Sequence, residues 1–194
     1  MSKIETVGII GAGQMGNGIA HVFARAGYEV LLNDIAPAAL EAAMATLARN
    51  LDREVARGKA TAEDRDAALA RIRTTQHLAD LGPCDLIIEA ATEREEIKHR
   101  IFADLGPHLA AHTILTSNTS SIPITRLAGR TDRPERFMGF HFMNPVPVMQ
   151  LVELIRGVAT DQATFDTLAA VVARLGKTAA AAEDYPGFIV NRIL

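Results

Sequence analysis

The feature that most constrains the fold of this chain is a glycine-rich turn between an apolar run and a helical pattern. The run, residues 4–10, is rich in β-branched side chains, as in a strand that is buried on both faces. The turn reads GAGQMG over residues 11–16, and an amphipathic pattern follows it as far as Gly27. A turn of this kind between a strand and a helix predicts a site for the pyrophosphate of a dinucleotide.

The three glycines of this turn have different expected tasks. Gly11 permits the tight turn, Gly13 lets a phosphate approach the backbone, and Gly16 lets the helix pack closely on the strand. The amide groups and the dipole at the start of the helix would then face the phosphates. His21 lies nearly opposite the apolar face of this helix, which predicts a solvated or rim position.

A second strand-like run, residues 28–33, ends at Asp34. In folds of this type an acidic side chain at about this distance from the glycine turn binds the ribose hydroxyls of the cofactor. A carboxylate there would repel a 2′-phosphate, which favours NAD over NADP. The alternative is that Asp34 only caps the helix that is expected to begin at Pro37.

The rest of the chain alternates between strand-like runs and helical patterns. Two helical patterns, residues 37–58 and 61–72, follow one another and predict a hairpin that the body covers only in part. Further strands are expected at residues 84–90 and 112–116. The alternation predicts an α/β fold, with a Rossmann-like, doubly wound, mostly parallel sheet and a helical-hairpin insertion.

Bulk properties narrow the class of protein. The chain has 194 residues, enough for one domain, and its net charge of −3 gives no reason to expect a nucleic-acid or membrane partner. No apolar stretch approaches the length of a membrane span, and no charged-then-apolar leader is present. The single cysteine, Cys84, fits a buried core position better than a nucleophile. We expect a soluble, cytoplasmic protein without a metal site.

A histidine and a glutamate form the candidate acid/base pair. His141 follows the strand-like run 137–140, and Glu153 lies in a second run, 150–155, after a proline-containing loop. An imidazole titrates near neutral pH, and a carboxylate that fixes its tautomer would make it a plausible general base. A structural histidine beside an unrelated glutamate is the alternative.

Polar residues from distant segments are expected to meet at one edge of the sheet. Ligands bind outside the carboxyl ends of the strands in such folds. The glycine turn, Asp34, Glu93, the polar loop 117–121 and His141 each follow a strand-like run, so all should project from that edge. This convergence favours the functional interpretation of His141.

With these motifs assembled, the chain resembles the 3-hydroxyacyl-CoA dehydrogenases, especially the 3-hydroxybutyryl-CoA type of fatty acid metabolism and β-oxidation. The resemblance runs over residues 3–194 and rests on GAGQMG, ATEREEIK, SNTSSIPIT, GFHFMNPVPVMQLVE and DYPGFIVNRIL. It implies reversible hydride transfer between NAD and carbon 3 of a 3-hydroxyacyl-CoA.

The resemblance also implies roles for individual residues. His141 matches the family's general base and Glu153 its partner, while Ser120 and Asn191 match polar residues beside the reacting carbon and Asn144 one beside the histidine. The implied NAD contacts are Gly11, Gly13, Gln14, Met15, Gly16, Asp34, Ala91, Thr92, Glu93, Lys98 and Ser120.

Two of these assignments depend on the resemblance alone. From the pattern of residues, Lys98 would be a solvated charge on an exposed helical face, and Ser120 a plain loop hydroxyl. Asn50 and Arg57, on a polar flank of the long helix, match positions where family members contact CoA, although both suit an ordinary surface. Capping boxes are expected at Thr61 with Asp64 and at Thr92 with Glu95.

The end of the chain departs from the family pattern. Residues 1–184 match the NAD-binding domain, and residues 185–194 match a linker and the start of an all-helical domain that forms the homodimer. We therefore expect the chain alone to bind NADH but to reduce acetoacetyl-CoA poorly, with Phe188 and Ile189 lacking packing partners. The alternatives are a non-catalytic NAD-binding module and a related 3-hydroxyacid dehydrogenase. The sequence leaves 3-hydroxybutyryl-CoA and 3-hydroxyadipyl-CoA open as substrates.

Overall fold

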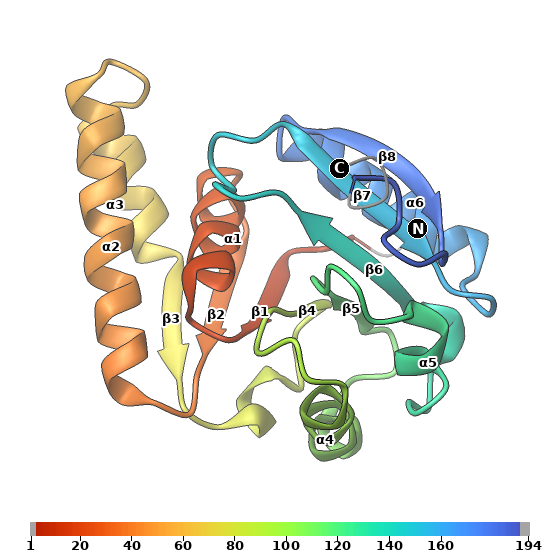
Figure 1. Ribbon diagram of the computed structural model, residues 1–194. Coiled ribbons are helices and arrows are strands. Elements are labelled where there is room, and N and C mark those ends of the chain that lie inside the picture. The colour runs from red at the N-terminus through yellow and green to blue at the C-terminus, as the bar shows by residue number, and fades with distance from the viewer. Residues whose placement is uncertain (1–2, 191–194) are drawn as a thin grey trace.

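A computed structural model describes residues 3–190 of the chain (Figure 1). Within these residues one eight-stranded sheet has the order β3-β2-β1-β4-β5-β6-β7-β8. The strands are β1 Thr6–Ile10, β2 Glu29–Asn33, β3 Ile72–Thr75, β4 Leu86–Glu89, β5 Ile114–Ser117, β6 Phe137–Phe142, β7 Leu151–Arg156 and β8 Thr178–Glu183. The α-helices are α1 Gln14–Arg25, α2 Pro37–Ala56, α3 Ala62–Ala70, α4 Glu95–Leu105, α5 Ile124–Ala128 and α6 Gln162–Arg174.

The sheet is parallel except at one junction. Neighbouring strands from β3 to β6 all run parallel, β7 runs against β6, and β8 is parallel to β7. Helices α1, α2, α3 and α6 pack on one face, and α4 and α5 pack on the other, so the sheet has a hydrophobic core on each side. The predicted doubly wound, mostly parallel fold is confirmed.

The glycine turn has the tight backbone that its sequence predicts. Gly11 has a φ of +98°, and a Cβ added there would lie 2.7 Å from the carbonyl oxygen of Ala90. A Cβ at Gly16 would lie 1.8 Å from the carbonyl oxygen of Gly11, so only glycine lets the helix start this close to the strand. At Gly13, by contrast, no described atom lies within 4 Å of the added Cβ, which leaves the backbone open to a ligand.

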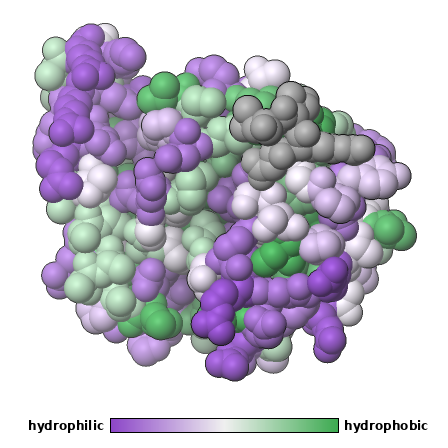
Figure 2. Space-filling model, in the orientation of Figure 1, coloured by the Kyte–Doolittle hydropathy of each residue, from purple (hydrophilic) through white to green (hydrophobic). Residues whose placement is uncertain are grey.

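Helices α2 and α3 form the predicted hairpin, which stands at the β3 end of the sheet (Figure 1). The α3 capping box is present: Asp64 N donates to Thr61 Oγ1 at 3.1 Å and Thr61 N donates to Asp64 Oδ2 at 3.0 Å. Figure 2 shows the outer part of the hairpin as largely hydrophilic surface, and α3 contributes the buried Ala68. The hairpin is therefore only partly covered by the body, as the sequence predicts.

His21 is not a solvated residue. Its Nε2 lies 2.9 Å from Oε1 of Glu54 on α2, and Arg25 Nη1 lies 2.9 Å from the other oxygen of the same carboxylate. Only 2% of the His21 surface is exposed. The sequence prediction was wrong because it considered α1 alone, whereas α2 covers this side of the helix.

Several local features differ from the sequence predictions. Strands β3 and β8 and the short helix α5 were not predicted, because their segments are short or Ala-rich and carry weak strand or helix signals. The capping box predicted at Thr92 is wrong: α4 begins after Arg94, and no side chain of the described residues caps it.

Cys84 is buried as expected, and burial, with help from Asp85, raises the pKa of its thiol to about 11. None of the helices within residues 3–190 is both long and apolar enough to cross a bilayer.

Candidate active site

The antiparallel junction of β6 and β7 places the candidate acid/base pair side by side. Its register pairs His141 directly with Glu153. Side chains at directly opposite positions project from the same face of a sheet and lie within contact distance. Nδ1 of His141 accordingly lies 2.6 Å from Oε2 of Glu153. The carboxylate lies beside the imidazole, as the sequence predicts.

Glu153 is held on both of its oxygens. Its side chain is 0% exposed, and Oε1 accepts hydrogen bonds from the backbone amides of Ile189 at 2.9 Å and Val190 at 2.8 Å. Both oxygens of this buried carboxylate are thus paired, as a buried polar group requires. The contact with Glu153 engages Nδ1 of His141, which leaves Nε2 as the other ring nitrogen.

A cavity of about 520 Å³ borders the imidazole. It brings together predicted residues from five segments of the chain, from the start of α1 to the loop after β6. They are Met15, Ala91, Glu93, Lys98, Ser120, His141 and Asn144. The expected convergence at one edge of the sheet is thus present, although the role of each residue stays a prediction.

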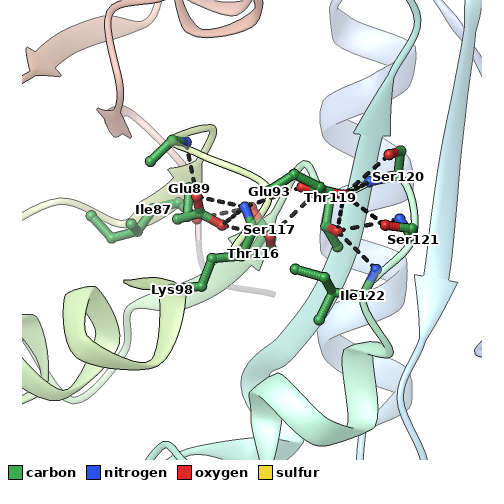
Figure 3. Close-up of polar contacts among 11 residues, drawn as sticks. Ile87, Glu89, Glu93, Lys98, Thr116, Ser117, Thr119, Ser120, Ser121 and Ile122 are labelled. Carbon is green, nitrogen blue, oxygen red and sulfur yellow. Dashed lines mark hydrogen bonds and ion pairs between the residues drawn. The ribbon is translucent and has the colours of Figure 1, made fainter. Parts of the chain in front are cut away.

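Glu93 organises the loop that carries Ser120 (Figure 3). Its Oε1 accepts hydrogen bonds from Thr119 Oγ1 at 2.6 Å, from Ser120 N at 2.8 Å and from Ser121 Oγ at 3.2 Å. Burial alone would raise the pKa of Glu93, but these hydrogen bonds and the charge of Lys98 outweigh burial and lower it. The ionised carboxylate therefore fixes the loop at the wall of the cavity.

Lys98 is buried, not solvated. Its side chain is 1% exposed, and Nζ lies 2.8 and 2.7 Å from the two oxygens of Glu89 and 3.6 Å from Oε2 of Glu93 (Figure 3). Glu89 also accepts a hydrogen bond from Ser117 Oγ at 2.6 Å. Sequence reasoning missed Glu89, and the available signal was a charged residue in an otherwise apolar strand, because a buried charge requires a partner.

The dinucleotide end of the site fits the predicted cofactor. Asp34 Oδ2 accepts a hydrogen bond from the amide of Ala12 at 2.8 Å, and Oδ1 accepts one from the amide of Ala36 at 3.0 Å. Within residues 3–190 no side chain caps the start of α1, and its first turn holds no acidic residue. Together with the open backbone at Gly13, this leaves a helix N-terminus suited to a phosphate.

A second cavity, of about 410 Å³, lies between α2 and the loop after β6. Gln14, Asn50 and Asn144 line it, and Gln14 Nε2 donates to Asn144 Oδ1 at 3.1 Å. Asn144 also lines the first cavity, so this side chain borders both. The exposed residues Arg57 and Thr92 line neither of these two cavities. Asn191 lies outside the described residues.

Comparisons with known proteins agree with these features. A family model described as "3-hydroxyacyl-CoA dehydrogenase, NAD binding domain" matches residues 6–185. The 3-hydroxybutyryl-CoA dehydrogenase of Bradyrhizobium diazoefficiens is 58% identical over 98% of this chain and 65% of its own length. The crystal structure of (S)-3-hydroxybutyryl-CoA dehydrogenase from Ralstonia eutropha superposes with a TM-score of 0.96 at 47% identity, over 98% of this chain and 68% of that one.

A relative named for a different substrate is also similar. The 3-hydroxyadipyl-CoA dehydrogenase of Escherichia coli is 44% identical over 100% of this chain and 41% of its own length. The chain spans about two thirds of the length of the 3-hydroxybutyryl-CoA dehydrogenases that it matches.

Proposed function

The chain belongs to the 3-hydroxyacyl-CoA dehydrogenase family, and from that premise we propose that it oxidises a 3-hydroxyacyl-CoA to the 3-oxoacyl-CoA, reversibly. Bound NAD would supply the hydride acceptor. The single observation that carries this proposal is the buried His141–Glu153 pair at the wall of a cavity next to the glycine turn.

His141 is the proposed general base. With Nδ1 donating to Glu153 Oε2, the lone pair of Nε2 is available to accept the proton of the 3-hydroxyl group. The negative charge of Glu153 stabilises the imidazolium that forms, and it does so more effectively because the carboxylate is buried. General-base assistance of this kind contributes roughly 10²–10⁴ in rate.

The other residues of the cavity bind and orient. The hydroxyl of Ser120 and the amide of Asn144 border the same space as His141 and are proposed to contact the substrate oxygen atoms. The second cavity, which Asn144 shares, is proposed to hold the CoA arm beside Asn50. The glycine turn and Asp34 are proposed to hold the pyrophosphate and the adenosine ribose. The homodimer and a domain boundary near residue 184 stay predictions.

The test measures NADH binding and turnover separately in the same chain. NADH binding is followed by fluorescence, and turnover by loss of NADH absorbance with acetoacetyl-CoA, 3-oxoadipyl-CoA or free acetoacetate. We expect the chain to bind NADH and to reduce acetoacetyl-CoA in preference to acetoacetate, at a low rate. The His141→Ala variant should bind NADH and lose turnover.

Each alternative has its own outcome in this experiment. If the chain binds NADH but shows no turnover that His141→Ala abolishes, the proposal is contradicted, and the chain is a non-catalytic NAD-binding module. Equal rates with acetoacetate and acetoacetyl-CoA would identify a dehydrogenase of free 3-hydroxyacids. A preference for 3-oxoadipyl-CoA would indicate 3-hydroxyadipyl-CoA as the substrate, as in the name of the Escherichia coli relative. A preference for acetoacetyl-CoA would indicate 3-hydroxybutyryl-CoA, as in the name of the Bradyrhizobium relative.

A further inference from the structure

The segment after β8, residues 184–190, returns to the active site and contacts its buried carboxylate. We name it the return segment. It begins at Asp184, whose Oδ1 accepts a hydrogen bond from the amide of Ile124 at 2.8 Å and whose Oδ2 accepts one from the amide of Thr125 at 2.7 Å. These amides are at the start of α5, which follows the loop that carries Ser120. Asp184 thus anchors the return segment beside the active-site loop.

A turn then reverses the direction of the chain. The amide of Phe188 donates to the carbonyl oxygen of Tyr185 at 2.9 Å, with Pro186 and Gly187 between them and a φ of +78° at Gly187. Proline followed by a glycine of positive φ is the pattern of a type II turn. The local sequence therefore encodes the reversal.

Phe188 fixes the end of this turn. Its φ of +49° lies in the left-handed region, which side chains other than glycine rarely adopt. The residue is nevertheless 4% exposed, packs in the core under α4 and α5, and has its ring centroid 6.1 Å from that of His141. The expectation that Phe188 lacks packing partners is wrong, and its buried ring offsets the cost of the unusual backbone.

This geometry brings two backbone amides of the return segment to Glu153. The amides of Ile189 and Val190, directly after Phe188, donate to Oε1 of Glu153, while Oε2 contacts the imidazole. Val190 also borders the cavity that His141 lines. The carboxylate is therefore held between a histidine and a segment that two side chains, Asp184 and Phe188, keep in place.

We propose that Asp184 and Phe188 are positioning residues for the His141–Glu153 pair, acting through the amides of the return segment. This inference rests on the proposed function, in which the pair performs the proton transfer. Loss of the anchor lets the return segment withdraw, Glu153 loses two donors, and the imidazole loses its fixed orientation. A displacement of about 1 Å at a reacting group lowers rates by up to about 10²-fold.

The chain offers a matched control for Asp184. Asp161 is also a carboxylate at a helix start, where its Oδ1 accepts a hydrogen bond from the amide of Thr164 at 2.6 Å. It caps α6 and lines a small cavity with His112 and Arg136, near the amino ends of β5 and β6. Neither Glu153 nor any residue of the return segment lines that cavity. Replacing either aspartate by asparagine removes one charge. Only at Asp184, where both oxygens accept hydrogen bonds, does the change also remove an acceptor and so loosen the return segment, because the single acceptor at position 161 is kept.

The experiment compares Asp184→Asn with Asp161→Asn in the full chain. We expect Asp184→Asn to lower kcat by roughly tenfold with an unchanged KM for NADH, because a displaced base slows the chemical step and spares cofactor binding. Asp161→Asn keeps its capping oxygen and should leave kcat unchanged, with only a small drop in the thermal midpoint from the negative charge lost at the start of α6. Phe188→Ala keeps the Asp184 anchor but removes the buried ring, and it should lower kcat by a similar factor. It serves as the second test if Asp184→Asn fails to fold.

A proton NMR signal provides a readout that does not need turnover. The Nδ1–H of His141, in a 2.6 Å hydrogen bond to a carboxylate, should give a strongly downfield resonance. It should move upfield or broaden in Asp184→Asn and stay in Asp161→Asn. If the wild-type chain turns over no acyl-CoA, the proposed function fails while this signal still tests the positioning role. An unchanged resonance and an unchanged kcat in both Asp184→Asn and Phe188→Ala would overturn the inference.

Discussion

Two buried histidines within residues 3–190 are paired with glutamates, and the two pairs differ in which partner is enclosed. In the His141–Glu153 pair Nδ1 lies 2.6 Å from Oε2, the glutamate side chain is 0% exposed, and the imidazole borders the candidate active-site cavity. In the His21–Glu54 pair the contact is 2.9 Å, the imidazole is enclosed, and the glutamate side chain is 24% exposed. The same two side chains at similar distances thus occupy opposite environments.

This difference matches the proposed chemical role of the His141–Glu153 pair and a structural role of the His21–Glu54 pair. Nδ1 of His21 is buried and has no hydrogen-bond partner among residues 3–190, and Glu54 is shared with Arg25. A groove of about 330 Å³ is lined by His21 together with Arg25, Glu54 and Lys177, but only 2% of the His21 surface is exposed. The pair ties α1 to α2. An imidazole–carboxylate contact serves as a general base only where a second ring nitrogen can meet a substrate.

The largest expected effect comes from replacing the two histidines in parallel. His141→Gln should lower kcat/KM by roughly 10²–10⁴, the usual contribution of general-base catalysis. His21→Gln should leave kcat/KM unchanged and lower the thermal midpoint, because it disturbs only the contact between α1 and α2. Initial rates with acetoacetyl-CoA and thermal unfolding of both variants measure this. Similar losses of rate in the two variants would erase the distinction.

A smaller effect is expected from the two glutamates. Glu153→Gln keeps the shape of the side chain, but its amide group lets the ring adopt the wrong tautomer, so kcat should fall by roughly 10²-fold. Glu54→Gln should change kcat by less than about twofold, as is usual for partly exposed sites away from the chemistry. NADH affinity should be the same in both variants. A retained kcat in Glu153→Gln would argue against an orienting carboxylate.

The smallest expected effect concerns the pH dependence of stability. Burial lowers the pKa of His21 below its ordinary value of 6.5; Glu54 opposes the shift, and Arg25 and Lys177 reinforce it. At a pH between the ordinary pKa of 6.5 and the lowered pKa in the native chain, the unfolded chain binds a proton at His21 that the native chain does not. The free energy of unfolding should therefore fall as the pH drops below about 6.5.

His21→Gln isolates this contribution. The variant lacks the titrating group, so its free energy of unfolding should decline less steeply between about pH 7 and about pH 5 than that of the wild type. Chemical denaturation at several pH values gives the two slopes. Parallel slopes would show that His21 titrates alike in the native and unfolded chains.

Those parts of the fold and site that depend on local pattern were predictable from sequence. The glycine turn has its own backbone requirements at Gly11 and Gly16, and apolar runs with flanking loops mark β6 and β7. Once those strands are neighbours, a short connection implies an antiparallel pair, which brings His141 and Glu153 together. These features follow from steric rules and strand periodicity within a few residues of the site.

The features that sequence reasoning missed depend on contacts between distant segments. Lys98 is buried because the carboxylate of Glu89 on β4 meets it, and His21 is buried because α2 covers it. Phe188 finds its packing partners on the far side of the sheet from α1. No periodicity within one helix reports these contacts, because each partner comes from another element of the fold.

The antiparallel ladder between β6 and β7 makes the catalytic geometry independent of the intervening loop. The backbone pairing of the two strands sets which side chains face each other, so residues 143–150 could change in sequence or length without separating His141 from Glu153. A slip of one residue in the ladder would instead turn Glu153 to the opposite face. Because Met143, Asn144 and Met149 of this loop border the cavity, changes in the loop would alter the cavity wall while the proposed proton-transfer pair stays in place.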